Sequence, residues 1–138
     1  MELTRFAIRE KIMNALYSCL IKEKAGNDFD PKDELMDCFD SSEFTDIDLF
    51  AQEVFVKALV NKDQIVSEVS PFLNKWTFDR LNYIAQAIFL LAISECKYCK
   101  LTSKPVAINC AIDLAKKYLD STDYKYINAV LDKVLLSK

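Results

Sequence analysis

Two arginines near the start of the chain, Arg5 and Arg9, are spaced to act together. Residues four positions apart lie on one face of a helix. The same face carries the apolar residues Ile12, Leu16 and Leu20. An arginine on an inward stripe must reach solvent or find a partner. At a helix start we expect both to emerge at an edge, where guanidinium donors suit phosphate. The alternative is an ion pair within the chain, for example with Glu2 or Glu10.

Cys96 and Cys99 form a CxxC pair, which by itself is a weak metal or redox signal. A structural zinc site needs four ligands, and the other cysteines are isolated: Cys19, Cys38 and Cys110. Thioredoxin-type chemistry needs a βαβ context, which the sequence does not predict. The pair therefore favours small core residues over a metal or redox enzyme. We expect no metal and no cofactor.

Acidic residues are concentrated between residues 27 and 75, where twelve occur. Asp28, Asp30 and Asp33 lack the glycine and the closing glutamate of a calcium loop. We interpret the block as a solvated acidic face that meets a basic partner or repels wrong ones. The chain has no histidine and a single glycine, Gly26. Histidine-based triads and glycine-rich phosphate loops are thus excluded, and we expect no enzyme.

Aromatic and basic residues gather near the C-terminus. They are Lys116, Lys117, Tyr118, Tyr124, Lys125 and Tyr126. Aromatic rings can stack on unpaired bases while lysines follow phosphates, or the rings can pack between helices with the lysines in solvent. The spacing does not decide between these. Both ends of the chain carry more basic than acidic residues, so they form a positive face if the fold brings them together.

The elements that position these residues are predicted to be helices in one domain, because sheets need many glycine turns. The expected helices cover about 3–24, 31–39, 43–69, 77–99, 102–119 and a last one capped by Ser121, with a short turn at 71–75. Residues 87–93 are apolar on every side and should be the most buried. In the helix expected over 102–119, which is the sixth element when the turn at 71–75 is counted, Val106, Ile108, Ile112 and Ala115 are expected to face inward. We expect no membrane span and a cytoplasmic location with reduced thiols.

Several segments of the chain are distinctive in their wording: Arg9-Glu10, Ala15-Leu16-Tyr17, Pro71-Phe72-Leu73, Arg80-Leu81-Asn82, and residues 105–109, 111–117 and 126–133. Together they resemble the NusB family of bacterial transcription antitermination factors. The resemblance covers the whole chain and is most specific in residues 76–133. It implies an all-α fold of about seven helices, in two small subdomains packed as one NusB-like domain. Helices 1–3 would span about 1–70, and helices 4–7 about 71–138.

The resemblance also implies partners and sites. Family members bind the boxA element of ribosomal RNA leaders together with NusE, a ribosomal protein, and act in the RNA polymerase antitermination complex. The implied RNA-binding residues are Arg5, Arg9, Phe72, Thr122, Asp123 and Lys125. Tyr17 and the exposed side of the fifth helix around Ala85 would contact NusE. A homodimer of the free protein is left open.

Departures from the family pattern define the alternatives. Phe6 and Ala7 interrupt the usual arginine run, so we expect weak RNA affinity without NusE. Ala85 stands where relatives can have an acid, which predicts a rearranged NusE contact. Cys110 stands where relatives commonly have a glutamate, and Ala129 stands where they commonly have a glycine. Nothing in the sequence explains either difference. The main alternative is a protein–protein regulator of the same fold without RNA binding. A further alternative is the same fold acting as the RNA-binding module of a ribosomal RNA methyltransferase. Such enzymes carry an additional catalytic domain, which we do not expect here.

Overall fold

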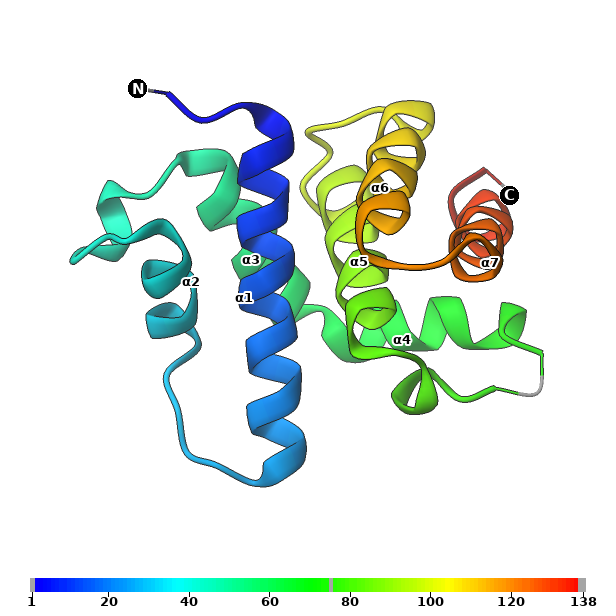
Figure 1. The fold of residues 1–138 in the computed structure, drawn as a ribbon, viewed down its shortest axis with the longest axis horizontal. Coiled ribbons are helices and arrows are strands. Elements are labelled where there is room, and N and C mark those ends of the chain that lie inside the picture. Colours follow the sequence, from blue (N-terminus) through cyan, green and yellow to red (C-terminus); the bar gives the residue numbers. More distant parts are fainter. Residues whose placement is uncertain (1, 75, 137–138) are drawn as a thin grey trace.

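The computed structural model describes residues 2–74 and 76–136, and this part of the chain contains helices and no strand (Figure 1). The α-helices are α1 (Arg5–Ala25), α2 (Pro31–Phe39), α3 (Leu49–Val60), α4 (Lys62–Val69), α5 (Tyr83–Ile93), α6 (Lys104–Tyr118) and α7 (Ser121–Leu131). Short 3-10 turns occupy Phe44–Asp46, Ser70–Phe72 and Phe78–Arg80, and π-helical turns follow α5 and α7 at Ser94–Tyr98 and Asp132–Leu136. The predicted all-helical class is confirmed.

Local capping signals define the limits of the first two helices. The Thr4 side chain accepts a hydrogen bond from the Ala7 N–H at 3.0 Å, which starts α1. Gly26, with φ of 77°, ends it in the left-handed conformation that glycine adopts without strain. Asp30 caps α2 and Pro31 occupies its first turn. The second helix predicted at 31–39 is confirmed residue for residue.

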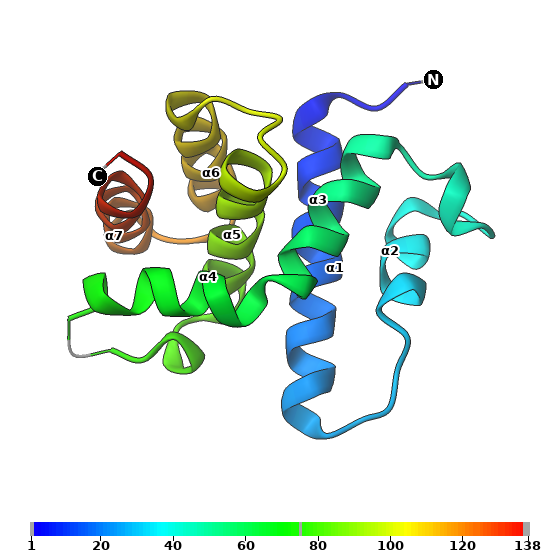
Figure 2. The same ribbon diagram turned by 180° about the vertical axis from the view of Figure 1, so that it is seen from behind.

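The single long helix predicted over 43–69 is wrong at its start and in its middle. α3 begins only at Leu49, after the 3-10 turn at Phe44–Asp46, and the chain breaks again at Asn61. Asn61 has φ of −102° and ψ of 15°, and its side-chain amide donates to the Lys57 carbonyl at 2.9 Å. The side chain thus competes for a helical carbonyl, which favours a turn at this position. Figure 2 shows α3 crossing α1 and α4 turning away beneath α5.

Two details of the later helices also differ from the prediction. Asp120, and not Ser121, caps α7, since its carboxylate accepts from the Asp123 N–H at 3.0 Å. Val106 is exposed in the first turn of α6, and Ile112 is only half-buried. Ile108 and Ala115 are buried as expected. The inward face of α6 is therefore rotated relative to the predicted stripe.

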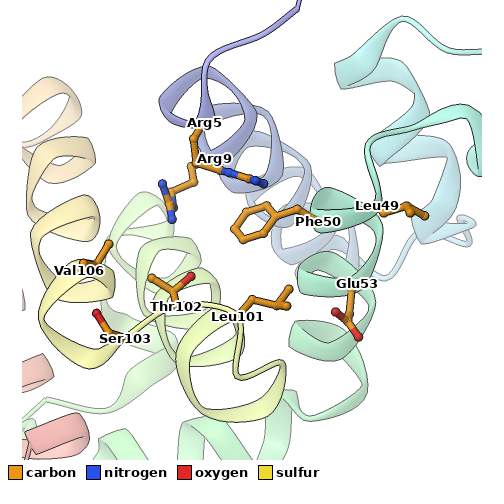
Figure 3. Close-up of a pocket in the computed structure, with 9 residues that line it drawn as sticks. All are labelled: Arg5, Arg9, Leu49, Phe50, Glu53, Leu101, Thr102, Ser103 and Val106. Carbon is orange, nitrogen blue, oxygen red and sulfur yellow. The ribbon is translucent and has the colours of Figure 1, made fainter.

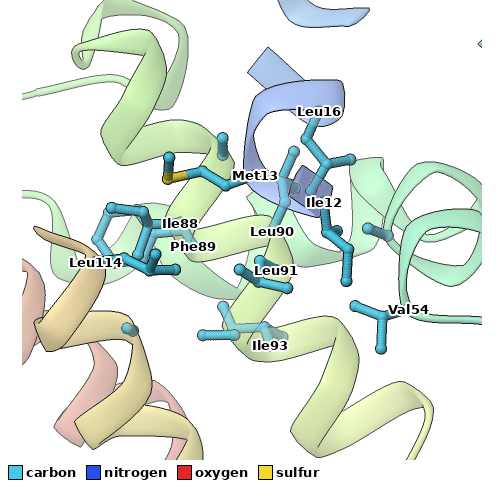
Figure 4. Packing of buried hydrophobic residues seen from close by; sticks show 14 of the residues in the cluster. Ile12, Met13, Leu16, Val54, Ile88, Phe89, Leu90, Leu91, Ile93 and Leu114 are labelled. Carbon is cyan, nitrogen blue, oxygen red and sulfur yellow. The ribbon is translucent and has the colours of Figure 1, made fainter. Parts of the chain in front are cut away.

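The core is built around α5, which packs against both α1 and α6. Residues 87–93 are at most 1% exposed, so the central position of this helix is confirmed. The predicted bounds of 77–99 are wrong, because α5 lies between the 3-10 turn at Phe78–Arg80 and the π-helical turn at Ser94–Tyr98. Figure 4 shows Ile12, Met13 and Leu16 of α1 meeting this helix, with Leu114 of α6 close to it. The core therefore fixes α1 and α6 relative to each other through α5.

The helices group on the two sides of the α1–α5 contact (Figure 1). α2 and α3 lie beside α1, whereas α6 and α7 lie beyond α5. A subdomain boundary near residue 70 stays a prediction. Within the described residues, no helix combines the length and the apolar character that crossing a membrane requires.

Candidate functional site

A buried ion pair joins α1 to the π-helical turn that follows α5. Arg9 Nε donates to Glu95 Oε1 at 2.9 Å, and Arg9 Nη2 donates to Glu95 Oε2 at 2.7 Å. The Thr102 hydroxyl donates to the same Oε2 at 2.6 Å. Glu95 is 1% exposed and Arg9 is 7% exposed. Burial lowers the pKa of Arg9, but the hydrogen bonds and charge of Glu95 outweigh it and raise the pKa overall.

This geometry corrects the expectation that both guanidinium groups emerge at the edge of the core. Arg9 is held inside by a carboxylate 86 residues away in the sequence. The alternative, an ion pair within the chain, is confirmed for Arg9, although its partner is neither Glu2 nor Glu10. An arginine on an inward stripe needs a carboxylate at the same depth, and the packing of α5 against α1 supplies Glu95 there.

Arg5 behaves differently, because its side chain is 51% exposed. Its guanidinium carbon lies 4.0 Å from the centre of the Phe50 ring, and Nη1 lies 3.9 Å from Asp48 Oδ1. Stacking on Phe50 orients the guanidinium group, while the exposed ion pair with Asp48 contributes little to the stability of the fold. Arg5 therefore presents an oriented positive charge to solvent.

Arg5 and Arg9 line an open groove of about 560 Å³ between α1, α3 and the start of α6 (Figure 3). The other lining residues are Leu49, Phe50, Glu53, Leu101, Thr102, Ser103 and Val106. Three of them, Leu49, Leu101 and Val106, are exposed apolar side chains. The groove thus combines apolar walls with one accessible cation at its rim.

The two basic ends of the chain meet where α6 packs beside α1, but an acidic residue takes part in their contact, so it is not a purely positive face. Glu10 Oε2 of α1 accepts from Lys117 Nζ at 2.5 Å and from the Tyr118 hydroxyl at 2.6 Å. Lys117 also lies 5.5 Å from the centre of the Phe6 ring. These hydrogen bonds hold the pKa of Glu10 below its ordinary value. Lys117 and Tyr118 thus tie α6 to α1, which is a structural role for part of the C-terminal aromatic and basic cluster.

A second pocket, of about 290 Å³, brings together the start of α7 and the segment before α5. Its lining residues are Trp76, Arg80, Leu81, Asn82, Thr122, Asp123 and Tyr126. Trp76 is 54% exposed, and Arg80 and Thr122 are exposed as well. Two residues singled out from sequence, Thr122 and Asp123, therefore share a pocket with an accessible tryptophan and an arginine.

The remaining predicted site residues are spread over the surface. Lys125 is exposed on α7, and Phe72 is half-buried against the core in the turn after α4. Tyr17 is half-buried on α1. The expectation of an exposed surface around Ala85 is wrong at that residue, which is 7% exposed because it faces the core. Arg5 and Thr122 line different pockets, so the predicted RNA-binding residues do not form a single cavity.

The acidic middle of the chain is only partly a solvated face. Glu34 is buried and accepts from Lys22 Nζ at 2.8 Å. Glu68 pairs with Lys97 and accepts from the Tyr98 hydroxyl at 3.2 Å. Burial and the charge of Glu68 raise the pKa of Tyr98 to about 12. These two carboxylates therefore hold helices together and are not free to bind a partner protein.

The cysteines are free thiols. Cys96 is buried and Cys99 is half-buried, with its Sγ 3.8 Å from the Ser94 hydroxyl. Burial raises the pKa of both thiols, so the reactive thiolate form is disfavoured. Cys110 lies near the Arg9–Glu95 pair, and burial raises the pKa of its thiol as well.

We expect Cys96 and Cys99 to hold neither a metal nor a disulfide. Among the described residues, no group of three or more metal-ligating side chains converges, so a zinc ion would lack ligands. Protein purified without chelator should contain far less than one zinc per chain and should fold equally well in EDTA. Stoichiometric zinc, or unfolding on chelation, would contradict this expectation.

Sequence reasoning missed four residues of these sites. Glu95 and Phe50 orient the arginines, and Trp76 and Arg80 line the second pocket. An acid within an otherwise apolar helix was a usable signal for Glu95, because a buried carboxylate requires a partner. Nothing local in the sequence connects Trp76 with Thr122.

Comparison with known proteins decides the family. The family model described as "NusB family" matches residues 7–136. The chain belongs to the NusB family. Among curated members, the transcription antitermination protein NusB of Methylacidiphilum infernorum is 31% identical over 96% of this chain and 91% of its own length. The NusB of Ligilactobacillus salivarius is 33% identical over 98% of this chain and 100% of its own length.

Solved NusB structures share the fold. A NusB of T. maritima superposes with a TM-score of 0.82 over 99% of this chain and 94% of that chain, at 23% identity. The NusB of a crystal structure with NusE and double-stranded RNA superposes with a TM-score of 0.78, at 21% identity and 97% coverage of both chains. The seven-helix NusB-like fold expected from the sequence is therefore confirmed.

Proposed function

We propose that this chain is a non-enzymatic RNA-binding adaptor in transcription antitermination. It binds boxA-type ribosomal RNA leader sequence together with NusE, and the pair joins the RNA polymerase antitermination complex. The observation that carries the proposal is membership of the NusB family across almost the whole chain, with relatives above 30% identity that are named transcription antitermination proteins. The exposed, oriented guanidinium group of Arg5 supports it.

Within this proposal the predicted residues take different roles. Arg5 and Lys125 contact phosphates, since both side chains are accessible cations. Thr122 and Asp123 contact bases, and Phe72 supports the turn beside them. Arg9 lines the groove but acts mainly by fixing α1 through Glu95. Tyr17 of α1 contacts NusE, since its half-buried side chain remains partly accessible.

One observation favours the regulator without RNA binding. Arg9 is neutralised by Glu95, and Phe6 and Ala7 interrupt the start of α1, so this helix offers RNA few accessible cations. The two functions differ in whether the complex with NusE binds RNA. RNA binding by the pair with NusE, and not by either protein alone, supports the adaptor. A complex with NusE that binds no boxA RNA supports the regulator.

Replacing Arg5 with Ala is expected to weaken RNA binding by the pair with NusE. The log–log salt dependence should become shallower by about 0.7 for each phosphate of single-stranded RNA that the protein no longer neutralises. The melting temperature should change little, because an exposed ion pair contributes only about 0–1 kcal/mol. RNA titrations at two or more salt concentrations measure the slope.

Two variants control for charge and stability. Arg5→Lys keeps the positive charge and should retain the salt slope. Lys32→Ala removes a charge from an exposed position on α2, and this helix lies on the other side of α1 from α6 and α7. This variant should leave RNA binding unchanged. An unchanged slope in Arg5→Ala, or an equal loss in Lys32→Ala, would remove Arg5 from the RNA surface.

A further inference from the structure

The segment before α5 is linked to α7 by one hydrogen bond to a backbone carbonyl, and a second bond to the same carbonyl closes a local turn. The Leu73 carbonyl accepts from the Tyr126 hydroxyl at 3.2 Å and from the Trp76 N–H at 3.1 Å. Asn74 between them adopts φ of 59°, which turns the chain sharply. A tyrosine hydroxyl is protonated at neutral pH and can donate, and burial raises the pKa of Tyr126 further. Trp76 is therefore an exposed aromatic side chain on an anchored backbone.

The groups around Trp76 include both hydrogen-bond donors and acceptors. Arg80 supplies only donors, the Asp123 carboxylate only acceptors, and the Thr122 hydroxyl both. Asn82 uses its Oδ1 to cap α5 by accepting from the Ile84 N–H at 2.8 Å. Its amide nitrogen keeps two donor hydrogens. A flat aromatic surface thus lies beside polar groups of mixed character.

We propose that this pocket, lined by Trp76, Arg80, Asn82, Thr122 and Asp123, holds one unstacked base of single-stranded RNA. Trp76 stacks on the face of the base, and Asp123 with Arg80 reads its hydrogen-bonding edge. The inference rests on the proposed function, and adds to it a base-binding pocket and two residues that the sequence did not suggest, Trp76 and Arg80.

Size and chemistry favour a base over other occupants. A volume of about 290 Å³ lies near the lower limit of about 300 Å³ for small-molecule sites, which suits one ring system. An apolar side chain from a protein partner would leave the Asp123 and Arg80 groups unpaired on burial, which costs binding energy. A bare phosphate would be repelled by Asp123. The exposed cation Lys125 lies three residues after Thr122, so the two side chains are neighbours on the surface of α7. Lys125 is therefore placed to follow the backbone of the same strand.

The test uses Trp76 itself, because it is the only tryptophan of the chain. Its emission, recorded with a NusE variant that lacks tryptophan, reports on this pocket alone. Single-stranded boxA-type RNA with a fluorescein label gives binding independently through anisotropy. We expect RNA to quench the emission of Trp76 along the same titration curve that the anisotropy follows.

Substitutions then separate stacking from charge and from folding. Trp76→Ala should weaken RNA binding by the pair with NusE about tenfold, while Trp76→Phe retains most of the affinity. The salt slope should be unchanged in both, since neither substitution removes a cation that neutralises phosphate. The melting temperature should also be unchanged, because the side chain is half exposed.

Each contrary result identifies what has failed. If RNA binds by anisotropy but the emission of Trp76 or the affinity of Trp76→Ala is unchanged, the base pocket is overturned and the proposed function stands. If Trp76→Ala weakens binding to NusE without RNA, the pocket is a protein contact and the inference is overturned. If the unaltered pair binds no RNA at all, both the proposed function and the base pocket are overturned.

Discussion

Replacing Glu95 with Gln is expected to lower the free energy of unfolding by about 3–5 kcal/mol. Gln has nearly the shape of Glu but no charge, so the buried guanidinium group of Arg9 would lose its counter-ion. Removing one partner of a buried pair is costly because the remaining charge stays desolvated. Urea unfolding, followed by circular dichroism, measures the change.

Two further variants show whether the charge itself is responsible. Glu23→Gln makes the same chemical change in the exposed ion pair with Lys62, whose Nζ lies 2.5 Å from Glu23 Oε1, and should cost no more than about 1 kcal/mol. Replacing both partners, as Arg9→Met with Glu95→Leu, should recover most of the stability lost in Glu95→Gln. A loss below about 1 kcal/mol in Glu95→Gln would show that water reaches the pair.

Replacing Leu91 with Ala is expected to destabilise the protein by about 2–5 kcal/mol. Leu91 is 1% exposed within α5, between α1 and the rest of the core, so truncation leaves a cavity that rigid neighbours cannot fill. Leu49→Ala is the matched control, because Leu49 is 78% exposed and its truncation should change stability by no more than about 0.5 kcal/mol. Equal effects at the two positions would mean that α5 is not the centre of the core.

The buried pair and the core also determine how the candidate sites are held. Arg9 and Glu95 fix the first turns of α1 against the end of α5, and Thr102 extends the hydrogen bonds toward the start of α6. The groove that contains Arg5 is bounded by these same elements. A variant that loosens the pair should therefore weaken RNA binding indirectly, whereas Arg5→Ala should do so without loss of stability. Comparing unfolding with RNA titrations distinguishes the two causes.

Features set within one or two helical turns were predictable from the sequence. The start and end of α2 follow from Asp30, Pro31 and the polar residues after Phe39, and Gly26 ends α1. The apolar run at 87–93 identified the central helix, since a helix without a polar side must be surrounded. The lack of histidine and the single glycine are enough to exclude histidine-based triads and glycine-rich phosphate loops.

The tertiary structure decided what depends on residues far apart in the chain. The break at Asn61 turns α4 against α5, although the apolar pattern of 43–69 reads as one helix. Arg9 was expected at an edge, and it lies inside because α5 packs Glu95 at the same depth. Trp76 and Thr122 line the same pocket because the Tyr126 hydroxyl of α7 donates to the Leu73 carbonyl, which also accepts from the Trp76 N–H. Helix caps and apolar periodicity depend on residues a few positions apart, so they can be recognised in the sequence. The partner of a buried charge and the wall of a pocket come from distant residues, so they are decided only when the helices pack.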